Sequence, residues 1–140
     1  MIGRRVTPPE PLRRTLIELF GPAVDRVVVV ERSLYARLHF FAVATTRPRR
    51  ILLRGSAAEF FDDPAIVLHE YCHVLKQWET GRLSIWRYLL ESFRRGYWDN
   101  RFEVEAREFA DDHLRRFCAR LAQHRAALGA EDDRERDGYA

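Results

Sequence analysis

Two histidines and a glutamate in the stretch His69-Glu70-Tyr71-Cys72-His73 have the types and the spacing of a zinc site. Because an α-helix turns by about 100° per residue, positions four apart lie only about 40° apart on one face. Both imidazoles can then bind one Zn²⁺ at about 2.0–2.1 Å. Glu70 lies about 100° round from His69, where its carboxylate can take a proton from a water that the metal activates.

The HExxH pattern is rare by chance, since random placement of five His and twelve Glu among 140 residues gives about 0.015 matches. The competing interpretation is a polar helix face that carries two unrelated histidines. The flanking residues argue against it, because Ile66, Val67, Leu68, Val74 and Leu75 are apolar. Cys72 lies about 100° round from His73 and is expected to pack in the core, with ligation by its thiol as the alternative.

A catalytic zinc needs a third protein ligand beside an open position for water. Glu103 shares its expected helix face with Ala106 and Ala110, small residues that allow helices to approach closely. Glu105 lies about 200° round from Glu103, so the two carboxylates cannot bind one metal. We therefore expect Glu103 as the ligand, unless the acids of this helix are all exposed to solvent. The alternative ligands are Glu105, His113 and His124.

Start and stop signals place the motif on a helix. Asp62 and Asp63 can cap its first turn, Pro64 suits that turn, and Gly81 ends it. The hydrophobic patterns elsewhere predict helices at 12–20, 83–93 and 101–127, and strands at 24–30, 39–46 and 49–54. The last two strands are expected to form an antiparallel hairpin. The apolar stripe of the helix at 83–93 is expected in the core: Ile85, Trp86, Leu89, Leu90 and Phe93.

These elements predict an α+β fold, with a small antiparallel or mixed sheet of about three strands packed on the HExxH helix and two further helices. A chain of 140 residues with 46% hydrophobic residues is typical of one globular domain. We expect a flexible N-terminal arm at 1–9, the domain at 10–128 and a charged, disordered tail at 129–140.

Composition narrows the function classes. The chain has no apolar run of about 18 residues, which predicts no membrane span, and residues 1–9 lack the apolar core of a signal peptide, which predicts the cytoplasm. Two cysteines are too few for a disulfide framework. The net charge is +3, but the arginines are scattered among acids, so nucleic acid is not an expected partner. The oligomeric state stays open.

HExxH followed by a glutamate on a later helix resembles the gluzincin branch of zinc metallopeptidases, especially small single-domain bacterial members of uncharacterised function, the minimal gluzincins. Residues 100–106 have the pattern NxxExEA, similar to the segment with the third ligand in those proteins. Residues 44–46 and 51–53 look like their strand pair before the motif helix, so the likeness covers about 24–112.

The resemblance implies a zincin-like fold in which His69, His73 and Glu103 bind zinc and Glu70 is the general base. It also implies that an edge strand, either 51–54 or 41–46, aligns a peptide or protein substrate. Related proteins often carry an acid four residues after the ligand glutamate, which orients a zinc histidine, whereas this chain has Arg107. The possible substitutes are Asp63, Asp99, Asp111 or a backbone carbonyl.

The expected activity is that of a zinc-dependent metalloendopeptidase, a hydrolase of peptide bonds. Tyr97, just before the expected ligand helix, is the candidate for a second donor to the oxyanion. One alternative is a zinc-binding scaffold or interaction module without turnover, because a small chain leaves few residues for a specificity pocket. A nucleic-acid-associated domain is the third possibility.

Overall fold

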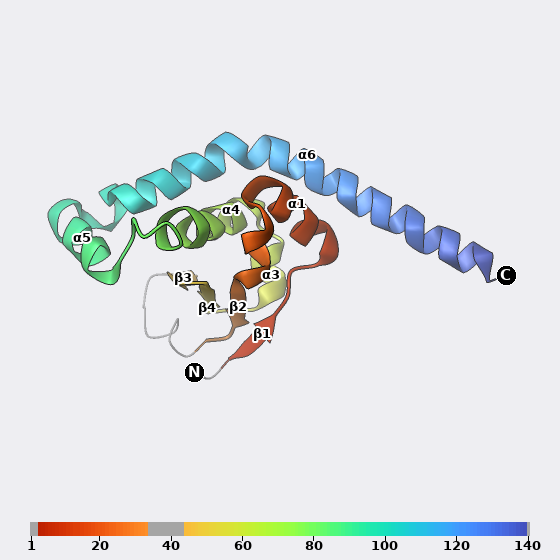
Figure 1. The fold of residues 1–140 in the computed structure, drawn as a ribbon, viewed down its shortest axis with the longest axis horizontal. Coiled ribbons are helices and arrows are strands. Elements are labelled where there is room, and N and C mark those ends of the chain that lie inside the picture. The colour runs from red at the N-terminus through yellow and green to blue at the C-terminus, as the bar shows by residue number, and fades with distance from the viewer. Residues whose placement is uncertain (1–2, 34–43, 140) are drawn as a thin grey trace.

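The computed structural model describes residues 3–33 and 44–139 and has an α+β architecture, which confirms the predicted fold class (Figure 1). The described residues contain a four-stranded mixed sheet, one strand more than expected, with the order β1-β2-β4-β3. Its strands are β1 (Arg4–Val6), β2 (Val28–Glu31), β3 (Ala44–Arg47) and β4 (Arg50–Leu53). β4 runs parallel to β2 and antiparallel to β3, so the predicted hairpin is confirmed.

Two predictions about the first thirty residues need correction. The N-terminal arm at 1–9 contains β1, which pairs antiparallel with β2. The strand predicted at 24–30 begins as a 3₁₀ helix, η1 (Pro22–Arg26), and only its second half is extended. Pro22 has the backbone angle of a first helical turn, and Val24 is buried from within that turn rather than from a strand. Of the strand predicted at 39–46, residues 39–43 lie outside the described part.

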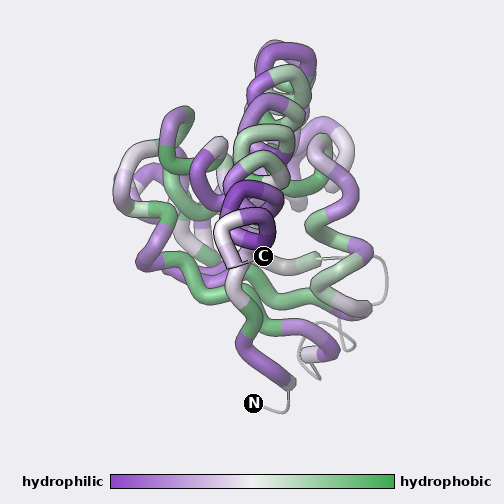
Figure 2. Tube along the Cα trace, turned by 90° about the vertical axis from the view of Figure 1, so that its right-hand side faces the viewer, coloured by the Kyte–Doolittle hydropathy of each residue, from purple (hydrophilic) through white to green (hydrophobic). Residues whose placement is uncertain are grey.

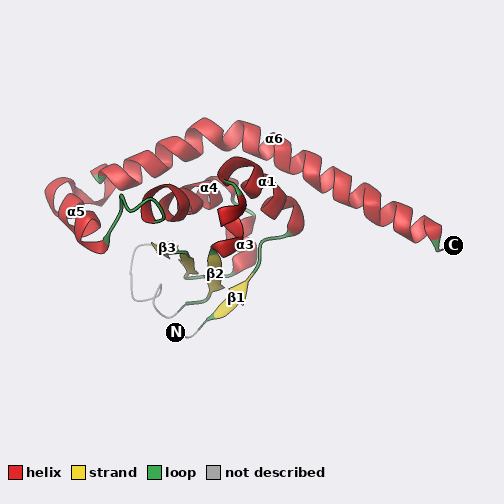
Figure 3. Cartoon of the chain, in the orientation of Figure 1, coloured by secondary structure: helices red, strands yellow, loops and turns green. Residues whose placement is uncertain are grey.

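The helices form a layer over the sheet, as Figure 3 shows. They are α1 (Glu10–Phe20), α3 (Ala57–Phe61), α4 (Pro64–Cys72), the π-helix η2 (His73–Trp78), α5 (Ile85–Asp99) and α6 (Arg101–Gly138). α4 begins as predicted, because the Asp63 carboxylate accepts a hydrogen bond from the Ile66 N–H at 3.3 Å. None of the described helices combines the length and the apolar content needed to cross a membrane.

The hydrophobic core lies around α4, which is covered by the sheet on one side and by α6 on the other (Figure 1). A helix enclosed in this way is apolar over most of its circumference, and Val67, Leu68 and Tyr71 are all fully buried. On α6, Ala106 and Ala110 are buried opposite α4, as the small side chains of that face predict. The close contact of α4 and α6 brings together the residues that carry the candidate chemistry.

The charged tail expected at 129–140 continues α6 instead, up to Gly138. At about 1.5 Å per residue the 38 residues of this helix span roughly 57 Å, and its C-terminal half extends beyond the domain (Figure 1). Figure 2 shows that these last turns are hydrophilic. Nothing in the sequence stops the helix, because no proline follows Gly129, and oppositely charged pairs such as Asp132 and Arg136 are spaced four apart.

The core position predicted for the stripe of α5 is wrong. No residue of α5 is buried, and the side chains of Trp86 and Phe93 are 81% and 90% exposed. The helix itself forms, and Gly96 breaks it as predicted, with a φ of 77° that favours glycine. The reason for the error is that α5 contacts the domain through polar side chains on its opposite face, which are described below.

Glu31 joins three elements of the fold. Its carboxylate, at the end of β2, accepts hydrogen bonds from the Ala57 N–H of α3 at 2.8 Å and from Arg4 Nε of β1 at 2.8 Å. The Ala57 N–H lowers the pKa of Glu31 and, with the help of Arg4, outweighs the effect of burial.

Because the folded-state pKa of Glu31 is lowered, its contribution to stability is present above the ordinary pKa of about 4.5 and is lost as the pH falls. We therefore expect Glu31→Gln to lower the Tm at pH 7. The difference in Tm from wild type should shrink as the pH drops below about 4.5. Thermal unfolding followed by circular dichroism measures this. The exposed Glu135→Gln is the matched control, and an equal Tm for Glu31→Gln and wild type at pH 7 would contradict the assignment.

Candidate metal site

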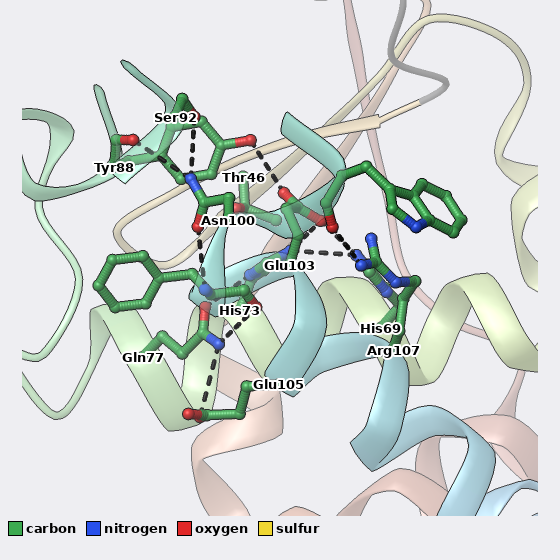
Figure 4. Close-up of polar contacts among 12 residues, drawn as sticks. Thr46, His69, His73, Gln77, Tyr88, Ser92, Asn100, Glu103, Glu105 and Arg107 are labelled. Carbon is green, nitrogen blue, oxygen red and sulfur yellow. Dashed lines mark hydrogen bonds and ion pairs between the residues drawn. The ribbon is translucent and has the colours of Figure 1, made fainter. Parts of the chain in front are cut away.

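Three side chains from two helices converge on one point, as Figure 4 shows. His69 comes from α4, His73 is the first residue of η2, and Glu103 comes from the first turn of α6. Glu103 Oε2 lies 2.9 Å from His69 Nε2 and 3.2 Å from His73 Nε2, and the two imidazole nitrogens are 3.1 Å apart. The structure thus brings together the three residues that the sequence predicted as ligands.

The protonation of His73 follows from its neighbour. His73 Nδ1 lies 2.6 Å from Gln77 Oε1, and because an amide oxygen only accepts, Nδ1 carries the proton of a neutral His73. The orientation of the Gln77 amide is fixed in turn, since its Nε2 donates to the carbonyl of Phe102 at 2.9 Å. His73 Nε2 therefore presents a lone pair to the other two atoms of the cluster.

Three nitrogen and oxygen atoms at 2.9–3.2 Å from one another need a proton or a metal cation among them to offset the repulsion of their lone pairs. The donor atoms of a tetrahedral zinc bound at about 2.0–2.1 Å stand about 3.3 Å apart. Two neutral imidazoles and one carboxylate are also a donor set that zinc binds in catalytic sites. The residues present therefore fit a single divalent ion of this kind.

The electrostatics of the protein without metal also favour a positive charge at this cluster. Burial would lower the pKa of His73, but the hydrogen bond of Glu103 and the charges of Glu70 and Glu103 outweigh it and raise this pKa to about 9. Burial would raise the pKa of Glu103, yet its bonds to the two histidines bring it well below the usual range. The cluster thus binds a positive charge, which is a proton when no metal is present.

Glu70 lies beside this cluster and is not part of it. Burial raises the pKa of Glu70, the nearby charge of Glu103 raises it further, and the two histidines lower it, with a net upward shift. A carboxylate with a raised pKa is a better proton acceptor near neutral pH. The position and the electrostatics of Glu70 suit a general base.

Gln77 is the first residue of the site that the sequence analysis missed. It is fully buried and joins His73 to the backbone of α6 directly before Glu103. The predicted partners of the zinc histidines were acids or a carbonyl, but the partner of His73 is this amide, and Asp63 caps α4 instead. Gln77 stands four residues after His73, the spacing that already joins the two histidines, so the signal was present in the sequence.

Tyr88 and Asn100 hold Glu103 from the other side. The Tyr88 hydroxyl donates to Glu103 Oε1 at 3.0 Å, which leaves Oε2 for the histidines. Asn100 Oδ1 caps α6 by accepting from the Phe102 N–H at 2.9 Å, and its Nδ2 donates to the Tyr88 carbonyl and to Ser92 Oγ. The asparagine of the NxxExEA pattern therefore fixes the start of α6 against α5, three residues before the ligand.

The structure keeps the alternative ligands away from the cluster. Glu105 forms an ion pair with Arg82, at 2.7 Å and 2.8 Å, on another side of α6. His113 Nδ1 donates to the carbonyl of Phe109 at 2.8 Å, and His124 Nε2 contacts Glu18 at 2.8 Å. Cys72 is buried, and burial raises the pKa of its thiol to about 12. Among the described residues, the one group with the geometry of a metal site is His69, His73 and Glu103.

Tyr97 and Arg107 lie at the end of α5 and in the facing turn of α6. Burial raises the pKa of Tyr97 to about 12, with contributions from the charges of Glu103 and Glu70, so its hydroxyl is protonated and electrostatically coupled to the site. Its role as an oxyanion donor stays a prediction. The Arg107 guanidinium stacks 4.0 Å from the Trp98 ring centroid and donates to the Trp98 carbonyl.

The edge of the sheet lies next to the motif helix. Trp78 Nε1, at the end of η2, donates to Thr46 Oγ1 of β3 at 3.2 Å. β3 is an edge strand, whereas β4 lies between β2 and β3. Of the two candidates for a substrate-aligning edge, 51–54 is therefore excluded, and the described part of 41–46 has the right position.

We compared the chain with protein-family models, curated proteins and solved structures. None matches. The candidate metal site is therefore identified from its geometry and from the motif residues alone.

Replacing Gln77 with Met tests its role in positioning. The change would leave the Nδ1 proton of His73 and the Phe102 carbonyl without their partners in a buried place. We expect metal affinity to fall by about 10–100-fold, as is usual when the partner of a histidine ligand is removed. A zinc titration against a competing chelator measures this, with the exposed Gln123→Met as the matched control. Equal affinities of Gln77→Met and wild type would remove Gln77 from the site.

Proposed function

We propose that this protein is a zinc-dependent metallopeptidase of the gluzincin type, with His69, His73 and Glu103 as metal ligands and Glu70 as general base. The observation that carries the proposal is the convergence of three ligand-type atoms at 2.9–3.2 Å, two from the consecutive helices α4 and η2 and one from α6. The HExxH spacing, the glutamate on a later helix and the mixed sheet beside them support a zincin-like arrangement.

When bound, zinc supplies Lewis acidity that lowers the pKa of water and polarises a carbonyl group. Glu70 accepts a proton from the attacking water and passes it to the amine that leaves. Gln77 holds the tautomer of His73, and Tyr88 holds the Glu103 carboxylate. Tyr97 is the candidate donor to the oxygen of the scissile carbonyl.

The proposed substrate is a peptide or protein segment in an extended conformation. β3 is an edge strand beside η2, so its outer N–H and C=O groups are free of a neighbouring strand on that side among the described residues. A peptide can add to such an edge through backbone hydrogen bonds. Trp78 fixes the distance of this edge from the motif helix through Thr46. The cytoplasmic location expected from the sequence stays a prediction.

Glu70→Gln separates catalysis from metal binding. Glutamine has nearly the same shape but cannot take a proton from water, so hydrolysis should fall by at least about a hundredfold while zinc stays bound. Cleavage of a quenched peptide library, with zinc content measured on the same samples, provides the readout. Hydrolysis by Glu70→Gln at the wild-type rate would refute the mechanism. A zinc-loaded wild type that cleaves nothing would instead favour a scaffold or interaction module without turnover.

The ligand assignment has its own test in two neighbouring glutamates. Glu103→Ala removes the carboxylate that faces both histidines and should abolish stoichiometric zinc binding. Glu105→Ala removes a surface ion pair with Arg82 and should leave zinc content unchanged. Metal analysis of the purified proteins decides the matter, and retention of zinc by Glu103→Ala together with its loss from Glu105→Ala would reverse the assignment.

A further inference from the structure

Helix α5 is amphipathic, but its polar side faces the domain and its apolar side faces the solvent. Its partly buried side chains, Tyr88, Glu91 and Ser92, are polar and face the domain. Its large apolar side chains are exposed to solvent: Ile85, Trp86, Leu89, Leu90 and Phe93. Because polar groups already attach α5 to the domain, folding leaves the apolar side without a partner among the described residues.

These apolar side chains form one continuous surface, which we call the α5 apolar face. Ile85, Leu89 and Phe93 are spaced four apart along one line of the helix, and Trp86 and Leu90 form the adjacent line. In the described part of the chain, every exposed large hydrophobic side chain lies on α5 except Tyr139. Single exposed apolar residues are ordinary, but a contiguous group of this kind marks an interaction site.

Positive charge borders the α5 apolar face. Arg87 and Arg94 lie about 20° apart on the helix and about 40–60° from Leu90, and both are exposed. Arg87 donates to the carbonyls of Gly81 and Arg82, which leaves its charge uncompensated. Residues 82–101 carry five arginines and two acids; Arg95 pairs with Glu91 and Arg82 pairs with Glu105 of α6, which leaves Arg87 and Arg94 beside the face. The surroundings of the face are therefore cationic.

We propose that the α5 apolar face docks on an anionic lipid bilayer. Helices that lie in the membrane interface combine Trp, Phe and Leu on one side with arginines along its border, where the guanidinium groups reach the lipid phosphates. Anionic lipid surfaces attract such arginines electrostatically. A second copy of the chain is a poorer occupant, because a two-fold contact through this face would place the same arginines opposite each other. The proposal holds whether or not the metal site is catalytic.

Flotation of the full chain with lipid vesicles tests this docking. The protein should bind vesicles of phosphatidylcholine mixed with phosphatidylglycerol, and bind phosphatidylcholine alone at least about tenfold more weakly. Trp86→Ser combined with Phe93→Ser should reduce binding to the anionic vesicles by at least about tenfold, because it removes the two most exposed aromatic groups of α5. Arg94→Gln should also weaken binding, and added salt should weaken that of wild type.

The matched control is Tyr139→Ser, which removes an exposed aromatic side chain far from α5 and should leave vesicle binding unchanged. Both serine substitutions on α5 replace exposed groups, so the variant should keep the wild-type Tm, which circular dichroism checks. Equal binding of this variant and wild type, or no binding of wild type to either vesicle, overturns the proposal. So does a wild-type dimer in solution that the same variant converts to a monomer, since the face would then join two copies of the chain.

Discussion

The candidate site depends on a single constraint, the close approach of three ligand-type atoms that the fold holds at 2.9–3.2 Å. A proton or a metal cation offsets the repulsion of their lone pairs, and the remaining structure serves to keep the three atoms in place. Ala106 and Ala110 let α6 approach α4 closely, which sets the distance between the histidines and Glu103. Gln77 and Tyr88 then bind the outer atoms of His73 and Glu103, so that the inner atoms face one another.

The sequence predicted the part of the site that depends on local geometry. Helical spacing alone places His69 above His73, and the small residues on its face identify Glu103 as the carboxylate that turns toward α4. Tyr88 was not predicted, because its contact with Glu103 exists only once α5 and α6 are packed. The spacing of Gln77 from His73 was visible in the sequence, but it does not show that Gln77 donates to the Phe102 carbonyl of α6. The π-helical turns that carry Gln77 were not predicted either, since their hydrogen bonds, such as Glu79 N–H to the Val74 carbonyl at 2.9 Å, differ from those of an α-helix.

The errors in α5 and in the C-terminal tail have one physical origin. Apolar periodicity shows that a helix has an apolar side, but it does not show whether that side faces the protein. In α1 the side of Leu12 and Leu16 is buried, whereas in α5 the apolar side is exposed, because Tyr88 and Ser92 provide hydrogen bonds that fix the other side. The tail of α6 shows the converse. A segment with almost no apolar residues still continues the helix, because backbone hydrogen bonds sustain it.

The attachment of α5 joins the two proposals of function and docking. Each hydrogen bond from Tyr88 and Asn100 contributes a net of only about 0.5–1.5 kcal/mol, and α5 buries no residue that would add hydrophobic stabilisation. Glu103 is therefore held on one side by the packed core of α4 and α6, and on the other by a helix that buries none of its own residues. A surface that binds the α5 apolar face would hold α5 in place from outside, and through Tyr88 it would favour the orientation of Glu103 in which Oε2 faces the histidines. By this reasoning the metal affinity of the site and the docking of α5 are coupled, and each must strengthen the other by the same factor.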